Sequence, residues 1–149
     1  MAEVSASATI NGAVDKVWAL LADFGRIEAW WPADGKVVID HVVNEGEGVG
    51  MVRHIYNKGA SAPVSERLEL LDPLGKVLIL SIIAPRPGAI TGYVATSRLT
   101  ALGPDSCRME HRAHVTTEPG REQAVEIGLY KTYEVMFAGL NAALKRQAT

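Results

Sequence analysis

The C-terminal end of the chain, residues 120–147, carries the pattern that most constrains the fold. Apolar residues recur there at steps of four, four, three, four and four, which places one stripe along a single helical face: Val125, Leu129, Tyr133, Met136, Leu140 and Leu144. Pro119 and Gly120 mark the start, and Lys145 and Arg146 put positive charge at the negative end of the helix dipole. At about 1.5 Å per residue, this helix is on the order of 40 Å long, so it needs a broad surface to cover its stripe.

The preceding part of the chain predicts a sheet that provides this surface. Period-two alternation and β-branched residues, separated by short Gly-, Pro- and Asp-containing turns, predict antiparallel strands over residues 4–10, 36–43, 49–56, 64–71, 76–84, 93–102 and 107–117. After the first strand we expect two short helices, one capped by Asn11 and ending near Asp23, the other over residues 26–31. The predicted fold is therefore α+β, with a curved sheet of about seven strands wrapped around the long helix.

Composition excludes several classes of protein. A chain of 149 residues predicts one domain over residues 1–149. The net charge of -2, without a run of Lys or Arg, argues against a nucleic-acid partner. The single cysteine and four histidines lack the spacing of a metal site, so we expect no metal or cofactor. No apolar run approaches the ~20 residues of a membrane helix, and no signal peptide is visible, so we expect a cytoplasmic protein with no integral membrane segment.

The order of these elements resembles that of the START-like, helix-grip superfamily, which includes polyketide cyclases, the birch-pollen-allergen family and lipid-transfer domains. The resemblance covers nearly the whole chain and implies an internal apolar cavity for a small molecule. Residues 65–72 and 76–83 are also similar to a strand–turn–strand segment of the plant abscisic-acid receptors. This local similarity implies Glu66 and Tyr93 as ligand contacts. It also implies mobile loops beside the cavity mouth, at residues 58–62 and 85–90.

The chain departs from those receptors at three motifs. Where the receptors have Ser-Gly-Leu-Pro in the first loop, residues 58–62 read Lys-Gly-Ala-Ser-Ala. Where they have His-Arg-Leu in the second loop, residues 88–90 read Gly-Ala-Ile. The lysine that pairs with the hormone carboxylate is absent near Pro32 and Ala33. The resemblance therefore implies the pocket and its loops, but neither the hormone nor the phosphatase partner.

Strand parity selects the first two polar residues that face the cavity. Glu66 shares the phase of Leu68 and Leu70, and it is either a ligand anchor or general base, or a salt-bridged residue at the rim. Arg53 also falls in an apolar phase. It either pairs with Glu66 or binds a ligand carboxylate through two hydrogen bonds. His54 falls in the opposite phase and is expected to face solvent.

Three further residues and a tryptophan pair complete the candidates. His111 is the one ionisable group on the apolar face of its strand, and it is either a structural histidine or a proton shuttle. Tyr93 and Tyr133 combine an apolar ring with a hydroxyl, which suits either a cavity wall or core packing. Of Trp30 and Trp31, we expect one to pack in the core and the other to touch ligand or solvent.

Three functions are compatible with these residues. The first is binding or transport of a small hydrophobic ligand, such as a lipid, polyketide or isoprenoid-like molecule, through Arg53, Glu66, Tyr93, His111 and Tyr133. The second is an enzyme of the polyketide cyclase/aromatase type, in which Glu66 or His111 abstracts a proton next to a carbonyl while Arg53 or Tyr93 stabilises the enolate. The third is a protein-interaction module. Ligand identity, the choice between carrier and enzyme, and the choice between monomer and homodimer stay open.

Overall fold

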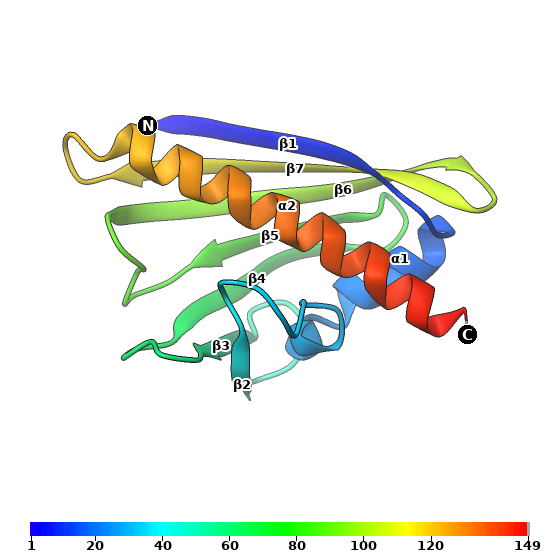
Figure 1. Ribbon diagram of the computed structural model, residues 1–149, viewed down its shortest axis with the longest axis horizontal. Helices are drawn as coiled ribbons and strands as arrows, with labels where there is room; N and C mark the ends of the chain where they lie inside the picture. The colour runs from blue at the N-terminus through cyan, green and yellow to red at the C-terminus, as the bar shows by residue number, and fades with distance from the viewer. Residues whose placement is uncertain (149) are drawn as a thin grey trace.

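The computed structural model describes residues 1–148 and confirms the predicted α+β arrangement (Figure 1). A seven-stranded antiparallel sheet lies beside one long helix. The elements in chain order are β1 (Ala2–Ile10), α1 (Val14–Ala22), the 3-10 helix η1 (Phe24–Ala29), β2 (Ile39–Glu45), β3 (Val52–Asn57), β4 (Val64–Asp72), β5 (Val77–Ile82), β6 (Ile90–Gly103), β7 (Ser106–Thr117) and α2 (Glu122–Gln147).

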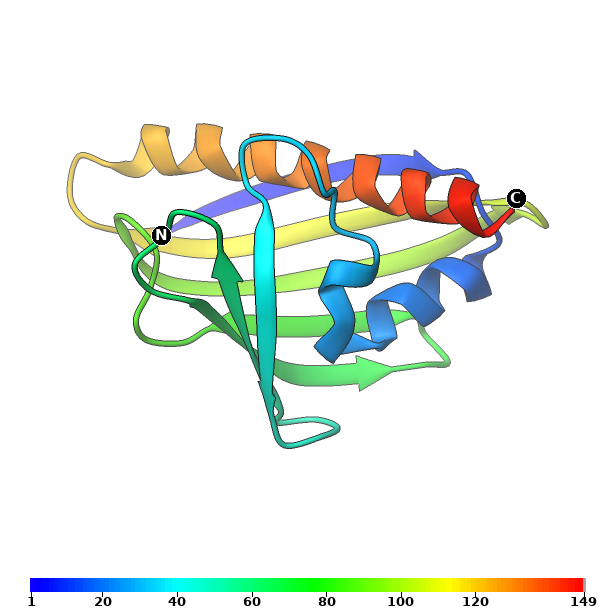
Figure 2. The same cartoon turned by 60° about the horizontal axis from the view of Figure 1, so that its bottom comes forward.

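The sheet has the order β1-β7-β6-β5-β4-β3-β2, so six strands follow one another as a meander and the first strand pairs with the last. In the β1–β7 pair, Ala6 lies opposite His111. Figure 2 shows the sheet curving beneath α2, while β2 and β3 run steeply across the direction of β6 and β7. The curved strands place the concave face of the sheet opposite α2, and a cavity lies between them.

The apolar stripe of α2 faces the sheet as predicted. Tyr133, Met136, Leu140 and Leu144 are buried, and Leu140 is fully inaccessible. Gly139 permits a close approach, since a Cβ atom there would lie 2.5 Å from the carbonyl oxygen of Trp30. Within residues 1–148, no helix is both long and apolar enough to cross a membrane, α2 included.

Two local predictions are wrong. Asn11 does not cap α1, because the helix begins at Val14 and has no side-chain cap. The backbone N–H of Asn11 instead donates to Asn141 Oδ1 at 2.8 Å, which ties the end of β1 to α2. Leu70 does not share the inward phase of Glu66, because the β4–β5 register shifts between Leu68 and Leu70. Such a bulge turns the following side chain to the other face, and Leu70 is exposed.

Candidate functional site

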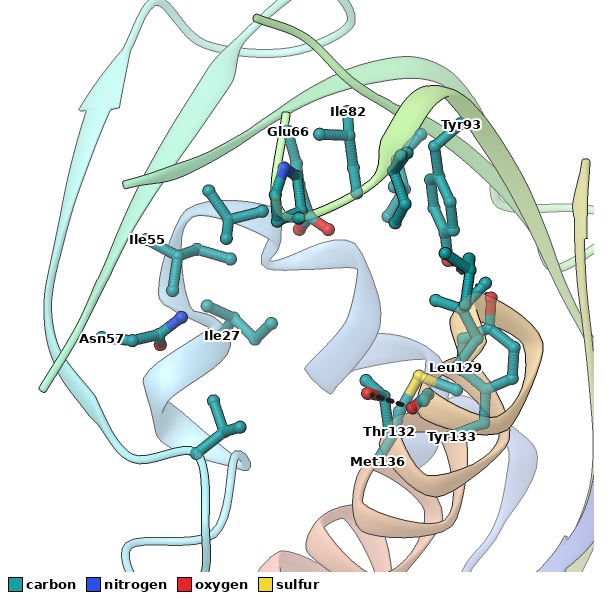
Figure 3. A pocket seen from close by; sticks show the side chains of 18 of the residues that line it. Ile27, Ile55, Asn57, Glu66, Ile82, Tyr93, Leu129, Thr132, Tyr133 and Met136 are labelled. Atoms are coloured by element: carbon teal, nitrogen blue, oxygen red, sulfur yellow. Dashed lines mark hydrogen bonds between the residues drawn. The ribbon is translucent and has the colours of Figure 1, made fainter. Parts of the chain in front are cut away.

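The space between the sheet and α2 is a cavity of about 510 Å³. Small-molecule sites in proteins span roughly 300–1,000 Å³, so the cavity is large enough for a small ligand. Its wall is mostly apolar and is built from η1, β3, β5 and α2, with Ile27, Trp30, Ile55, Leu80, Ile82, Leu129 and Met136 among the lining residues (Figure 3). All five predicted polar residues also line it: Arg53, Glu66, Tyr93, His111 and Tyr133. Val37, Gly88 and Arg121 line the cavity and are exposed, which marks where it meets solvent.

Arg53 and Glu66 form the first polar cluster. They lie opposite each other on β3 and β4. Arg53 Nε and Nη2 contact the same carboxylate oxygen, Glu66 Oε1, at 2.8 Å and 2.7 Å. Arg53 Nη1 donates to the backbone carbonyl of Phe24 at 2.9 Å, and the guanidinium lies 3.8 Å from the centre of the Phe24 ring. The ion pair between Arg53 and Glu66 that strand parity allowed is therefore present. The Glu66 carboxylate compensates the positive charge of Arg53 in the cavity wall.

The Glu66 carboxylate remains partly open. Its side chain is 15% exposed and points into the cavity (Figure 3). Arg53 Nε and Nη2 both contact Oε1, and no group within residues 1–148 donates a hydrogen bond to Oε2. A carboxylate oxygen accepts hydrogen bonds and can also accept a proton.

Tyr93 and Tyr133 form the second polar cluster. Their hydroxyl oxygens, from β6 and α2, lie 2.7 Å apart. Burial raises the pKa of Tyr93 well above its ordinary value and raises the pKa of Tyr133 to about 12. Both phenols therefore stay protonated at neutral pH. The Glu66 carboxylate adds a smaller electrostatic contribution in the same direction to the pKa of both hydroxyls, so the two clusters share one space.

His111 supports the tyrosine pair from β7. Its Nδ1 atom lies 2.7 Å from the Ser97 hydroxyl, and its ring packs edge-on against Tyr133 with 4.4 Å between ring centres. Burial lowers the pKa of His111 to about 4, so the ring is neutral at pH 7. His111 thus has the partners of a structural histidine and also lines the cavity, while a role as proton shuttle stays a prediction.

The tryptophans and loops follow the predictions in part. Trp30 is buried, whereas Trp31 is half-buried and donates from Nε1 to the Val37 carbonyl at 3.0 Å. Four residues of the predicted loop 85–90 line the cavity, namely Pro87, Gly88, Ala89 and Ile90, the last of which begins β6. No residue of the predicted loop 58–62 lines it, although the flanking Asn57 and Val64 do. Only the strand residues on either side of that loop reach the cavity.

Sequence reasoning missed three polar residues of the wall. Asn57 lies four residues after Arg53 on the same strand, so strand parity places it inward. Thr132 follows Leu129 by three and Val125 by seven, which is the helical spacing of the stripe. For Arg121, which lines the mouth just before α2, no pattern in the sequence gives a signal.

His54 lies outside the cavity, as predicted, but it is not simply solvated. Its Nδ1 atom is 2.6 Å from the Ser65 hydroxyl, and its Nε2 atom is 3.1 Å from Glu45 Oε1. The contact with Ser65 joins β3 to β4, whereas Nε2 has no hydrogen-bond partner within residues 1–148 despite the nearby Glu45 carboxylate of β2. Nowhere in the described part of the chain do three His, Cys, Asp or Glu side chains gather as a metal site requires.

Comparisons with known proteins give a family and a set of similar folds. Residues 1–145 match the family model described as polyketide cyclase/dehydrase and lipid transport. No curated protein matches significantly by sequence. The structure is similar to the protein XoxI from Bacillus cereus, with a TM-score of 0.83 and 21% identity over 100% of this chain and 99% of that one.

Two solved enzymes have a similar fold. The ZhuI aromatase/cyclase from Streptomyces sp. R1128 has a TM-score of 0.79 and 16% identity, over 99% of this chain and 96% of that one. Norcoclaurine synthase from Thalictrum flavum, solved in complex with dopamine and hydroxybenzaldehyde, has a TM-score of 0.78 and 15% identity, over 97% of this chain and 87% of that one. At these identities the likeness concerns the fold.

Proposed function

We propose, from the premise that this chain belongs to the polyketide cyclase/dehydrase and lipid-transport family, that it binds a small, largely apolar molecule between its sheet and α2. The observation that carries the proposal is the cavity itself. It is large enough for such a ligand, mostly apolar, and supplied with a few polar groups at defined places. Residues 1–149 would then act as one ligand-binding domain for a lipid, a polyketide or an isoprenoid-like molecule.

The charge distribution supports a ligand whose buried part is uncharged. Arg53 and Glu66 compensate each other, and Tyr93, Tyr133 and His111 are neutral at pH 7. An ion placed among them would lose its hydration without gaining an unpaired counter-charge, which is costly. A neutral molecule with a few oxygen functions loses less on entering.

Native mass spectrometry of the protein purified without denaturants tests this proposal. We expect a retained small molecule that is released on unfolding. The variant Leu129→Trp, which fills the cavity from α2, should lose it, whereas Ile127→Trp on the exposed side of the same helix should keep it. Equal retention by both folded variants would place the ligand elsewhere and contradict the proposal.

A second candidate function is proton abstraction next to a carbonyl, as a cyclase requires. Glu66 Oε2 is an available base, and the Tyr93–Tyr133 pair supplies a donor for a developing enolate oxygen in the same cavity. The similar fold of the ZhuI aromatase/cyclase makes this chemistry compatible with the architecture.

Hydrogen exchange at a bound ketone separates the two functions without knowledge of the natural substrate. With 2-acetylnaphthalene in D2O, an enzyme of this type should accelerate deuterium incorporation at the methyl group, measured by NMR. The acceleration should disappear in Glu66→Gln. Binding of the ketone without accelerated exchange would support the carrier and exclude this role of Glu66.

A further inference from the structure

The tyrosine pair has one hydroxyl proton more than its own hydrogen bond uses. Each phenol carries a single O–H donor, and the two oxygens of Tyr93 and Tyr133 share one hydrogen bond of 2.7 Å. Whichever hydroxyl donates, the other retains a proton for which no acceptor exists within residues 1–148. Both residues are more than nine-tenths buried, and buried polar groups are normally hydrogen-bonded.

The hydroxyl group that carries this second proton is a strong hydrogen-bond donor. The hydroxyl that accepts the internal hydrogen bond is polarised by it, which strengthens its own O–H as a donor. The raised pKa of both phenols keeps this proton in place at neutral pH. A ligand atom that contacts the tyrosine pair should therefore be a hydrogen-bond acceptor.

Glu66, in contrast, needs a hydrogen-bond donor from the ligand. Its Oε1 atom is occupied by Arg53, while Oε2 has no partner within the described chain, and the side chain lines the cavity (Figure 3). An ionised carboxylate accepts hydrogen bonds and donates none, so only a donor on the occupant satisfies it. His111 adds no fixed demand, because Nδ1 is occupied by Ser97 and the remaining nitrogen donates in one tautomer and accepts in the other.

We infer that the ligand carries a carbonyl-type oxygen for the tyrosine pair and a hydroxyl-type donor for Glu66, joined by an apolar body. The inference rests on the proposed function and names the ligand class within it, namely hydroxy-ketones and related hydroxy-carbonyl compounds. The wall between the two clusters is apolar, with Ile82 and Leu129 among its residues (Figure 3). A molecule lacking either group displaces water and leaves one cluster unpaired, which is the basis of strong discrimination.

Three matched naphthalenes test this ligand class by isothermal titration calorimetry. The compound 6-propionyl-2-naphthol offers both groups, 2-methoxy-6-propionylnaphthalene offers only the ketone, and 6-propyl-2-naphthol offers only the hydroxyl donor. We expect the first to bind about tenfold more tightly than each of the others, as one well-formed hydrogen bond allows. The ketone stretching band of the bound naphthol should also move to lower frequency.

Variants assign each preference to its cluster. Tyr93→Phe or Tyr133→Phe alone leaves one hydroxyl free to donate, so most of the ketone preference should persist. The double variant Tyr93→Phe/Tyr133→Phe should lose it, together with the infrared shift. Arg53→Met/Glu66→Leu removes both charges together and should lose only the preference for the hydroxyl. Tyr130→Phe, on the exposed side of α2, is the control and should change neither preference.

The outcomes separate the inference from the proposed function. Equal affinity of all three compounds for the native protein would overturn the inferred ligand class and leave binding in the cavity standing. Persistence of the ketone preference and the infrared shift in a folded Tyr93→Phe/Tyr133→Phe protein would also overturn it. Failure of all three compounds to bind would contradict the proposed function, and the inference with it.

Discussion

Replacing Arg53 by methionine should destabilise the protein by about 3–5 kcal/mol. Methionine keeps the packing against Phe24 but removes both contacts to Glu66 and the hydrogen bond to the Phe24 carbonyl. Arg53 is only 6% exposed, so its loss leaves a carboxylate without its counter-charge in a largely apolar wall. Removing one partner of a buried ion pair costs about this much free energy of unfolding. The 15% exposure of Glu66 admits some cavity water and favours the lower end of the range.

The double variant Arg53→Met/Glu66→Leu makes the reasoning testable. Replacing a buried ion pair by apolar side chains of similar volume is often nearly neutral, so the double variant should recover most of the loss. Urea unfolding followed by tryptophan fluorescence gives the free energies for the four proteins of the cycle. Strictly additive changes would refute an interaction between the two residues. Arg112→Met is the matched control, since Arg112 pairs with Glu3 at the surface and should cost no more than about 1 kcal/mol.

Three further predictions concern the core and the buried histidine. Leu140→Ala should lower stability by about 2–5 kcal/mol, and an unchanged urea midpoint would contradict the packing of α2. Gly139→Ala should destabilise because its Cβ would approach the Trp30 carbonyl, whereas Gly128→Ala, with open space around it, should stabilise by up to about 1 kcal/mol; the reverse order would contradict this geometry. Between pH 7 and pH 5, stability should fall by about 2 kcal/mol through His111, since the unfolded chain takes up a proton near pH 6.5 and the folded chain only near pH 4. His111→Gln should flatten that slope, and equal slopes would show that His111 does not contribute.

The fold was predictable because its two periodicities are long and regular. The stripe of α2 has six matching positions spread over more than five turns, and the predicted START-like, helix-grip superfamily is confirmed by the family match over residues 1–145. The two wrong predictions each depend on a single residue. The bulge between Leu68 and Leu70 adds one residue to the strand pairing, and no special residue type marks it in the sequence. Asn11 is a residue type that often caps helices, but its backbone N–H instead donates to Asn141 of α2.

Strand parity predicted which polar residues face the cavity, but it did not predict the hydrogen bonds that they make with one another. Arg53 and His111 lie inward because their strands keep a period of two, and Glu66 lies inward because it precedes the bulge and shares its phase with the buried Leu68. The hydrogen bond between Tyr93 and Tyr133 depends on how far α2 slides along the sheet, which no local pattern specifies. The contact of His111 with Ser97 likewise requires the exact β6–β7 register.

The pairing of the first strand with the last has a consequence for the order of folding. In the mature sheet, residue 6 lies opposite residue 111, so 105 positions of chain separate two neighbours. At about 5–20 residues per second, a ribosome that has released β1 delivers its partner roughly 5–20 s later. During that interval each of the strands β2 to β6 has at least one pairing partner already synthesised, whereas β1 has none. We therefore expect β1 to join the sheet only after β7 has been made, and its alternating apolar residues to stay exposed to other chains until then.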